Sequence, residues 1–192
     1  ANKHPAATVI ASKFDEVIRE GEGAIRSKRL QVYSSHDIYA IELAGVLKNS
    51  MALAAGALGG LGYGQNAMAF LITRGLGESI RLATAMGANR QAFLGLAGIG
   101  DLVATCTSPL SRNYTVGARL AKGETLEQII ATSTEVAEGI KTVSISKKLA
   151  DSTDIKLPII QNIYRVLFEG MNVEQALNYL MEYRWGYDAD YM

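Results

Sequence analysis

The spacing of apolar residues changes character after residue 35. Residues 8–12 have the β-branched composition of a buried strand, and residues 29–35 alternate between apolar and polar side chains. Residues 14–27, between them, have a mostly helical pattern. This order predicts a strand, a helix and a second strand. We therefore expect the first 35 residues to be the last β-α-β piece of an α/β sheet.

From His36 onward the strand signals fade and helical periodicity takes over. A long helix is expected at about residues 37–55, and the glycine-rich residues 56–64 are expected to break it. Asn66 is a suitable cap for a second long helix that ends near Met86. Further helices are predicted near residues 90–96, 101–107, 112–121, 125–131, 138–150, 158–168 and 173–183. The pattern therefore predicts a mainly α region of about eight helices.

Several of these predicted helices carry residues that favour helix ends. Gly87 is a C-terminal stop for the second long helix. Thr125 and Gln128 form a capping box, and Asn172 is a good cap for the last helix. The helix boundaries at these places are therefore predicted by local chemistry.

Composition and charge exclude several classes of function. Lys plus Arg equals Asp plus Glu, at 19 each in 192 residues, so no electrostatic argument favours nucleic acid or an anionic membrane as partner. The uninterrupted apolar run at residues 51–63 is too short to span a bilayer, and residues 1–11 do not resemble a signal peptide. We expect a soluble chain without a membrane-inserted segment. The absence of an initial methionine favours a cut inside a longer protein.

The single cysteine, Cys106, excludes an intramolecular disulfide framework and a cysteine-based zinc site. No metal site is expected. A reducing cytosol is the simplest setting for such a chain. A catalytic nucleophile is the alternative for Cys106, but a small buried hydrophobe is the favoured interpretation, because both histidines lie far away in the sequence.

Two glycine-rich stretches invite comparison with dinucleotide-binding loops. Residues 56–64 (GALGGLGYG) follow a long predicted helix rather than a strand, and their glycine spacing is wrong for that motif. Residues 98–101 (GIGD) lack the third glycine and a preceding strand. Neither stretch is predicted to bind a nucleotide. Residues 56–64 are expected to be a flexible or tightly packed connection between two helices.

Lys48 is unusual for its position on the first long helix. Its neighbours at helical spacing are small or apolar, namely Ile41, Ala44, Gly45, Met51, Ala52 and Ala55. An ammonium removed from water needs a partner or loses its proton, and a neutral lysine suits proton transfer near neutral pH. The alternative is a lysine at the edge of the stripe whose amine reaches solvent.

A second group of polar residues lies at two predicted helix starts. Asp101 is placed to cap residues 102–106, and its carboxylate is also placed to orient a lysine or a substrate hydroxyl. Ser111 can cap the next helix, with Arg112 and Asn113 in its first turn. Free N–H groups, the positive dipole end and a guanidinium favour a phosphate there. The alternative is a solvent-exposed arginine.

These residues together resemble the NAD(P)-dependent glycerol-3-phosphate dehydrogenase family in its bacterial form. The resemblance is carried by residues 41–49 (IELAGVLKN), 57–66 (ALGGLGYGQN), 71–88 (LITRGLGESIRLATAMGA), 93–117 (FLGLAGIGDLVATCTSPLSRNYTVG), 136–142 (VAEGIKT) and 157–170 (LPIIQNIYRVLFEG). The combination of the LKN lysine, the GLAGIGDL block (residues 95–102) and SRN at the right distance is specific, although no single piece is.

The resemblance implies a domain organisation and an activity. Members of the family have an N-terminal Rossmann domain and a helical C-terminal domain of the 6-phosphogluconate-dehydrogenase-like type. They interconvert glycerol 3-phosphate and dihydroxyacetone phosphate with NAD or NADP, for phospholipid synthesis in the cytoplasm, and are commonly homodimers. Residues 1–35 would be the remnant of the Rossmann domain, and residues 36–192 the helical substrate-binding and catalytic domain. The fragment alone is expected to be inactive.

The resemblance also implies roles for particular residues. Lys48 matches the family's proton acceptor. The substrate-binding positions, besides the lysine, are Asp101, Ser111, Arg112 and Asn113. The cofactor-binding positions are Arg112, Val136 and Glu138, although Ala137 stands where the family commonly has valine. Glu138 has a second interpretation as a residue of a helix's first turn. Two rivals remain: a related hydroxyacid dehydrogenase, and a non-catalytic helical module for dimerisation or binding.

Overall fold

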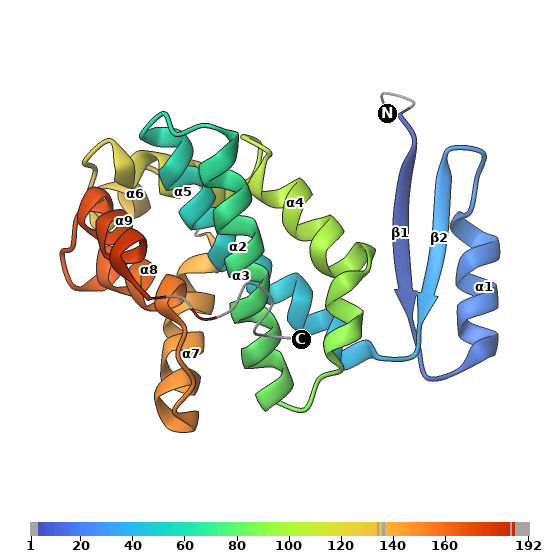
Figure 1. Cartoon of the computed structure of the whole chain (residues 1–192). Coiled ribbons are helices and arrows are strands. Elements are labelled where there is room, and N and C mark those ends of the chain that lie inside the picture. The colour runs from blue at the N-terminus through green and yellow to red at the C-terminus, as the bar shows by residue number, and fades with distance from the viewer. Residues whose placement is uncertain (1–3, 134, 136, 185, 187–192) are drawn as a thin grey trace.

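The N-terminal unit lies to one side of the helices (Figure 1). The computed structural model describes residues 4–133, 135, 137–184 and 186. Strand β1 (Ala6–Ala11), helix α1 (Asp15–Ile25) and strand β2 (Leu30–Ser35) follow one another. The two strands are parallel, with Ala6 opposite Leu30 and Ala11 opposite Ser35. The predicted strand, helix and strand are confirmed, and the mainly helical remainder is confirmed as well. The domain boundary at residue 35 stays a prediction.

Helix α2 (Ile38–Gly60) is the centre of the helical region. Among the described residues it contacts α3 (Gln65–Ala85), α4 (Asp101–Cys106), α5 (Arg112–Ala121) and α7 (Glu138–Thr153). The other elements are η1 (Arg90–Leu94), η2 (Leu96–Gly100), α6 (Leu126–Thr132), α8 (Pro158–Phe168) and α9 (Val173–Glu182). The described residues thus contain eight α-helices from α2 to α9, as the apolar pattern predicts.

The predicted break at residues 56–64 is wrong at its start, because α2 continues through Gly56 to Gly60. These glycines are packed against α5. A Cβ atom on Gly56 would lie 1.9 Å from the carbonyl oxygen of Tyr114, and one on Gly117 of α5 would lie 1.9 Å from the carbonyl oxygen of Leu53. Only glycine lets the two backbones approach this closely. The tightly packed alternative is therefore confirmed, inside a helix rather than between two helices.

The ends of α3 show one wrong and one correct prediction. The cap of α3 is Gly64, so Asn66 lies inside the helix instead of capping it. At the other end Gly87 has φ +89°, which is the backbone conformation expected of a glycine stop. The capping boxes that begin at Thr125 and Asn172 are both formed as predicted.

The apolar run of residues 51–63 is part of the 23-residue helix α2, which could cross a bilayer by length and composition alone. The core helix of a soluble protein passes the same test. Half of the most apolar window of α2 is buried inside the protein, as in the core helix of a folded domain. Met51, Ala52 and Ala55 are fully buried on it. Cys106 is also fully buried, and burial raises the pKa of its thiol to about 12, in agreement with a core role.

Glu78 on α3 is a buried carboxylate. Arg74 and Glu78 lie four residues apart, a spacing that predicts a weak pair, and this pair stays a prediction. Glu78 is fully buried, and its carboxylate accepts hydrogen bonds from the backbone N–H of Ile159 (2.6 Å) and Ile160 (3.0 Å). These are free N–H groups in the first turn of α8. Burial raises the pKa of Glu78 to about 8.

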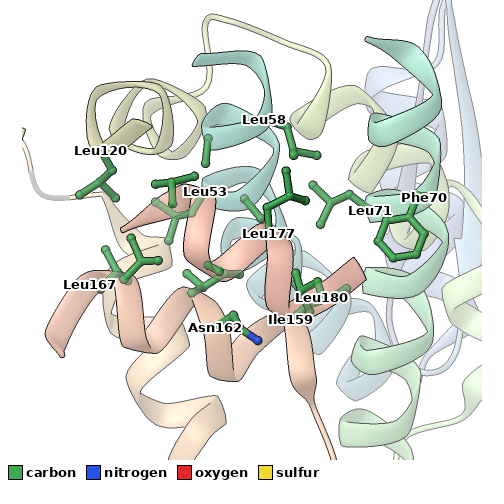
Figure 2. Close-up of a pocket in the computed structure, with 16 residues that line it drawn as sticks. Leu53, Leu58, Phe70, Leu71, Leu120, Ile159, Asn162, Leu167, Leu177 and Leu180 are labelled. Atoms are coloured by element: carbon green, nitrogen blue, oxygen red, sulfur yellow. The ribbon is translucent and has the colours of Figure 1, made fainter. Parts of the chain in front are cut away.

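An apolar hollow lies between α2, α3, α8 and α9 (Figure 2). Its walls include Leu53, Leu71, Ile159 and Leu177. Asn162 is the one polar residue among those that line it, and its amide nitrogen donates to the carbonyl of Pro158 within α8. No residue with a predicted role in chemistry lines this apolar hollow.

Candidate active site

Lys48 and Asp101 lie 53 residues apart in the sequence, and two different helices bring them together. The lysine lies in the middle of α2, and the aspartate is the first residue of α4. The Lys48 Nζ atom donates to Asp101 Oδ2 in an ion pair, with 24% of the lysine side chain and 38% of the aspartate side chain exposed. Lys48 therefore has a carboxylate partner, and its amine does not simply reach solvent from the edge of an apolar stripe.

Asp101 does not cap a helix, so the local prediction for it is wrong. The π-helical turn η2 runs directly into α4, and Asp101 accepts no capping hydrogen bond. A Cβ atom on Gly98 would lie 2.1 Å from the carbonyl oxygen of Phe93, so this turn requires glycine. The hydroxyl of Thr105 donates to the backbone carbonyl oxygen of Asp101 at 2.7 Å and lies 3.4 Å from the second carboxylate oxygen. The partner of the carboxylate is therefore Lys48, with Thr105 beside it.

The start of α5 places three of the predicted residues at one point. Ser111 is the cap, and its hydroxyl oxygen accepts from the Tyr114 N–H at 3.4 Å, as predicted. Arg112 is mainly exposed and forms an ion pair with Glu135. Asn113 turns inward and is 7% exposed. The first turn therefore carries one outward cation and one inward amide, and the anion beside Arg112 in this structure is Glu135.

Asn113 connects α5 to two other helices. Its Oδ1 atom accepts from the Gly139 N–H at 2.9 Å, and its Nδ2 atom donates to Asn49 Oδ1 at 3.1 Å. Asn49 in turn donates from Nδ2 to Glu138 Oε2 at 3.3 Å. Sequence reasoning gives Asn49 no role. The only signal for Asn49 in the sequence is that it directly follows Lys48, so both residues lie close together on α2.

These residues line one open cleft between α2, α4, α5 and α7. The lining side chains with polar groups are Lys48, Asn49, Thr105, Ser108, Ser111, Arg112, Asn113 and Glu138. Asp101 lines an adjoining depression that faces β1, and Ala104 belongs to both. The Lys48–Asp101 pair therefore stands between the two depressions. Glu138 is the first residue of α7, as its local interpretation predicts.

Two further predictions concern what the site holds. Val136 lies outside the described residues. Within the part of the chain that the structure describes, no group of three or more His, Cys, Asp or Glu side chains is arranged to hold a metal ion. The cleft therefore offers a cationic side chain, a lysine–carboxylate pair and oriented amides as its chemical groups.

Comparison with known proteins assigns the chain to a family. A family model described as the C-terminus of NAD-dependent glycerol-3-phosphate dehydrogenase matches residues 37–178. The protein of Parafrankia sp. (strain EAN1pec) named glycerol-3-phosphate dehydrogenase, NAD(P)+, is 47% identical over 181 residues, which cover 94% of this chain and 54% of the relative. A protein of the same name from Teredinibacter turnerae is 46% identical over 183 residues, covering 95% and 54%.

A solved structure supports the same assignment. The crystal structure of glycerol-3-phosphate dehydrogenase from Coxiella burnetii superposes with a TM-score of 0.88 at 34% identity, covering 94% of this chain and 56% of the other. Fold and cleft together define a helical domain in which a lysine–carboxylate pair lies beside a cationic helix start. The chain belongs to the family of NAD-dependent glycerol-3-phosphate dehydrogenases. It spans about half the length of the curated relatives it matches.

Proposed function

We propose that the protein containing this chain interconverts glycerol 3-phosphate and dihydroxyacetone phosphate with NAD or NADP. The observation that carries the proposal is the meeting of the Lys48–Asp101 pair with the start of α5 in one region. The first group can move a proton, and the second can hold a phosphate. The names of the relatives support the same reaction.

We assign the phosphate of the substrate to the first turn of α5. Arg112 supplies a guanidinium, Asn113 supplies an amide N–H, and the cap at Ser111 presents the positive end of the helix. Glu135 already neutralises Arg112, so a phosphate has to share or displace that carboxylate. Binding energy from the phosphate then orients the reacting carbon, which lies away from it.

We assign the transfer of the substrate's hydroxyl proton to Lys48. In the direction of alcohol oxidation, the neutral amine accepts the hydroxyl proton, and Asp101 stabilises the ammonium that forms. In the direction of ketone reduction, the ammonium returns that proton to the developing alkoxide. Asp101 therefore positions the base without exchanging a proton with the substrate.

The groups at the cleft mouth fit a nicotinamide dinucleotide. The Arg112 guanidinium suits a phosphate, and the Glu138 carboxylate suits a hydroxyl or amide donor. When bound, NAD or NADP supplies the hydride acceptor. Val136 is included in the cofactor contacts by resemblance. We also propose a homodimer in the cytoplasm and a role in making the glycerol backbone of phospholipids.

The proposal is tested by turnover of the intact protein with dihydroxyacetone phosphate and either NADH or NADPH. We expect turnover, and a much higher KM for unphosphorylated dihydroxyacetone. A preference for unphosphorylated substrates would favour a related hydroxyacid dehydrogenase. No turnover would favour a non-catalytic module.

A pair of variants on α5 tests the phosphate site itself. Arg112→Ala should raise the KM for dihydroxyacetone phosphate about tenfold or more, because it removes a charged partner of the phosphate. Arg119→Ala is the matched control, because Arg119 lies on the same helix but pairs with Glu124. An unchanged KM in Arg112→Ala would remove this residue from the site.

A further inference from the structure

The cleft contains a ring of hydrogen bonds that closes through three helices. It starts at the backbone N–H of Gly139, passes through the side-chain amides of Asn113 and Asn49, and ends at the carboxylate of Glu138. Gly139 and Glu138 are consecutive residues at the start of α7, so the ring begins and ends on the same turn. It therefore joins α7 to α5 and α2 along the cleft.

We propose that Asn49 is a positioning residue that fixes the orientation of the Asn113 amide toward the substrate. This inference rests on the proposed function, because it takes Asn113 as a group that meets the phosphate. Asn49 is itself the residue after Lys48 on α2. The ring therefore ties the amide on the phosphate side to the helix that carries the base.

The two ends of the ring determine how both amides point. A backbone N–H can only donate, so the Asn113 atom that meets Gly139 has to be the carbonyl oxygen. The Asn113 nitrogen then faces Asn49, which has to offer its own oxygen. Asn49 is left with its nitrogen toward Glu138, and an ionised carboxylate can only accept. Every donor in the ring points the same way.

This orientation matters for an anion in the cleft. An Asn113 amide held by Gly139 and Asn49 has its carbonyl oxygen engaged by a backbone N–H and has one N–H left to donate. A rotated amide would present oxygen to the phosphate and repel it. The Asn113 side chain is buried in this arrangement, so water does not easily replace a lost partner.

The packing at α7 shows that the ring is built into the fold. A Cβ atom on Gly139 would lie 2.5 Å from the carbonyl oxygen of Asn49 and 2.6 Å from Asn113 Oδ1. Ala137, which precedes α7, contributes no side-chain cap. Asn113 takes over that function from another helix. The start of α7 and the two asparagines therefore fix one another's positions.

The test uses Asn49→Asp in the intact protein, at saturating cofactor. The new carboxylate still accepts from Asn113 but faces Glu138, and like charges at this distance repel. Glu138 and the first turn of α7 should move, and Asn113 with them. We expect the KM for dihydroxyacetone phosphate to rise about tenfold or more, with a smaller change in kcat.

Rescue separates a positioning role from general destabilisation. In the double variant Asn49→Asp with Glu138→Gln, the glutamine amide donates to the new carboxylate, and the ring is closed again with its charge moved to α2. Its KM should return to within about threefold of Glu138→Gln alone. Asn66→Asp, which adds the same charge at an exposed position of α3, should leave KM unchanged.

The outcomes distinguish this inference from the proposed function. If the wild-type protein does not turn over dihydroxyacetone phosphate, the proposed function is overturned. Normal wild-type turnover with an unchanged KM in Asn49→Asp, or with no rescue by the double variant, would overturn the positioning role alone. If Asn49→Asp does not fold, Asn49→Ser removes the donor to Glu138 without adding charge, and an unchanged KM in that variant would also overturn the role.

Discussion

The apolar hollow and the polar cleft share helix α2 but offer a ligand different things. Leu53 and Leu58 line the apolar hollow (Figure 2). Lys48 and Asn49, which precede them on the same helix, line the cleft. The apolar hollow offers a ligand burial of apolar surface, an interaction that does not fix the ligand's orientation. The cleft offers a cation, a lysine–carboxylate pair and amides whose donors are aimed.

The difference shows that an apolar hollow is not by itself the place where chemistry occurs. A concave, mainly apolar pocket is the usual starting hypothesis for a binding site, when a few convergent polar groups accompany it. In the described residues, the convergent groups lie in the cleft instead. The apolar hollow should therefore govern the free energy of unfolding, and the cleft should govern turnover. The following variants separate the two.

The largest effect is expected for Lys48→Ala in the cleft. Removing the base should lower kcat by about 10³-fold, because general acid–base catalysis contributes factors of this size. The free energy of unfolding should change by less than about 1 kcal/mol, since the Lys48–Asp101 pair is partly exposed. Lys147→Ala, which breaks a pair with Asp151 on α7, is the control and should keep full turnover. A kcat within tenfold of wild type would contradict the base assignment.

The next effect belongs to the apolar hollow. Ile159→Ala should lower the free energy of unfolding by about 2–5 kcal/mol, because a fully buried side chain is truncated beside an existing space. Urea denaturation measures this loss, and the KM of the folded enzyme should stay the same. Ile145→Ala, at an exposed position of α7, should cost less than about 0.5 kcal/mol. Equal losses in both variants would show that the hollow does not depend on this side chain.

A pH-dependent effect is expected from Glu78, beside the apolar hollow. Its pKa is raised from 4.5 to about 8 by burial, against the hydrogen bonds from Ile159 and Ile160, which lower it. Between these pH values the folded state keeps the proton and the unfolded state loses it. The contribution of Glu78 to stability is therefore fully present below pH 4.5 and falls as pH rises to 8.

Glu78→Gln removes this titration. The wild-type free energy of unfolding should fall relative to that of Glu78→Gln, on the order of a few kcal/mol across this pH range, as measured by urea denaturation at several pH values. Glu182→Gln, at an exposed position of α9, should follow the wild-type curve. Parallel curves for wild type and Glu78→Gln would contradict the raised pKa.

The smallest effect is expected for Ser111→Ala at the edge of the cleft. Loss of the cap should lower the free energy of unfolding by about 0.5–2 kcal/mol, because the Tyr114 N–H loses its side-chain acceptor. Thermal unfolding measures this change. Ser152→Ala, near the exposed end of α7, should have an effect below about 0.5 kcal/mol. A stability equal to that of the control would show that the long 3.4 Å bond contributes nothing.

Local sequence was sufficient for the helices and for several of their ends. Caps such as Ser111, Thr125 and Asn172 interact with N–H groups three residues away, so neighbouring residues determine them. The positions of Lys48 and Arg112 among their neighbours also indicated that these residues are unusual. The sequence by itself therefore determined the mainly helical fold and five of the ten residues that line the cleft.

Tertiary structure decided what the local patterns could not. Gly56 lies inside a helix and packs against the backbone of Tyr114, far away in the sequence, and Asp101 forms an ion pair with Lys48 instead of a cap. Asn49 meets Asn113 across 64 residues. Helix propensity and capping depend on chain neighbours, whereas close packing and the partners of buried polar groups depend on which helices meet. That physical difference is why residues such as Lys48 and Arg112 could be named from the sequence, whereas Asn49 and the connections between the cleft residues could not.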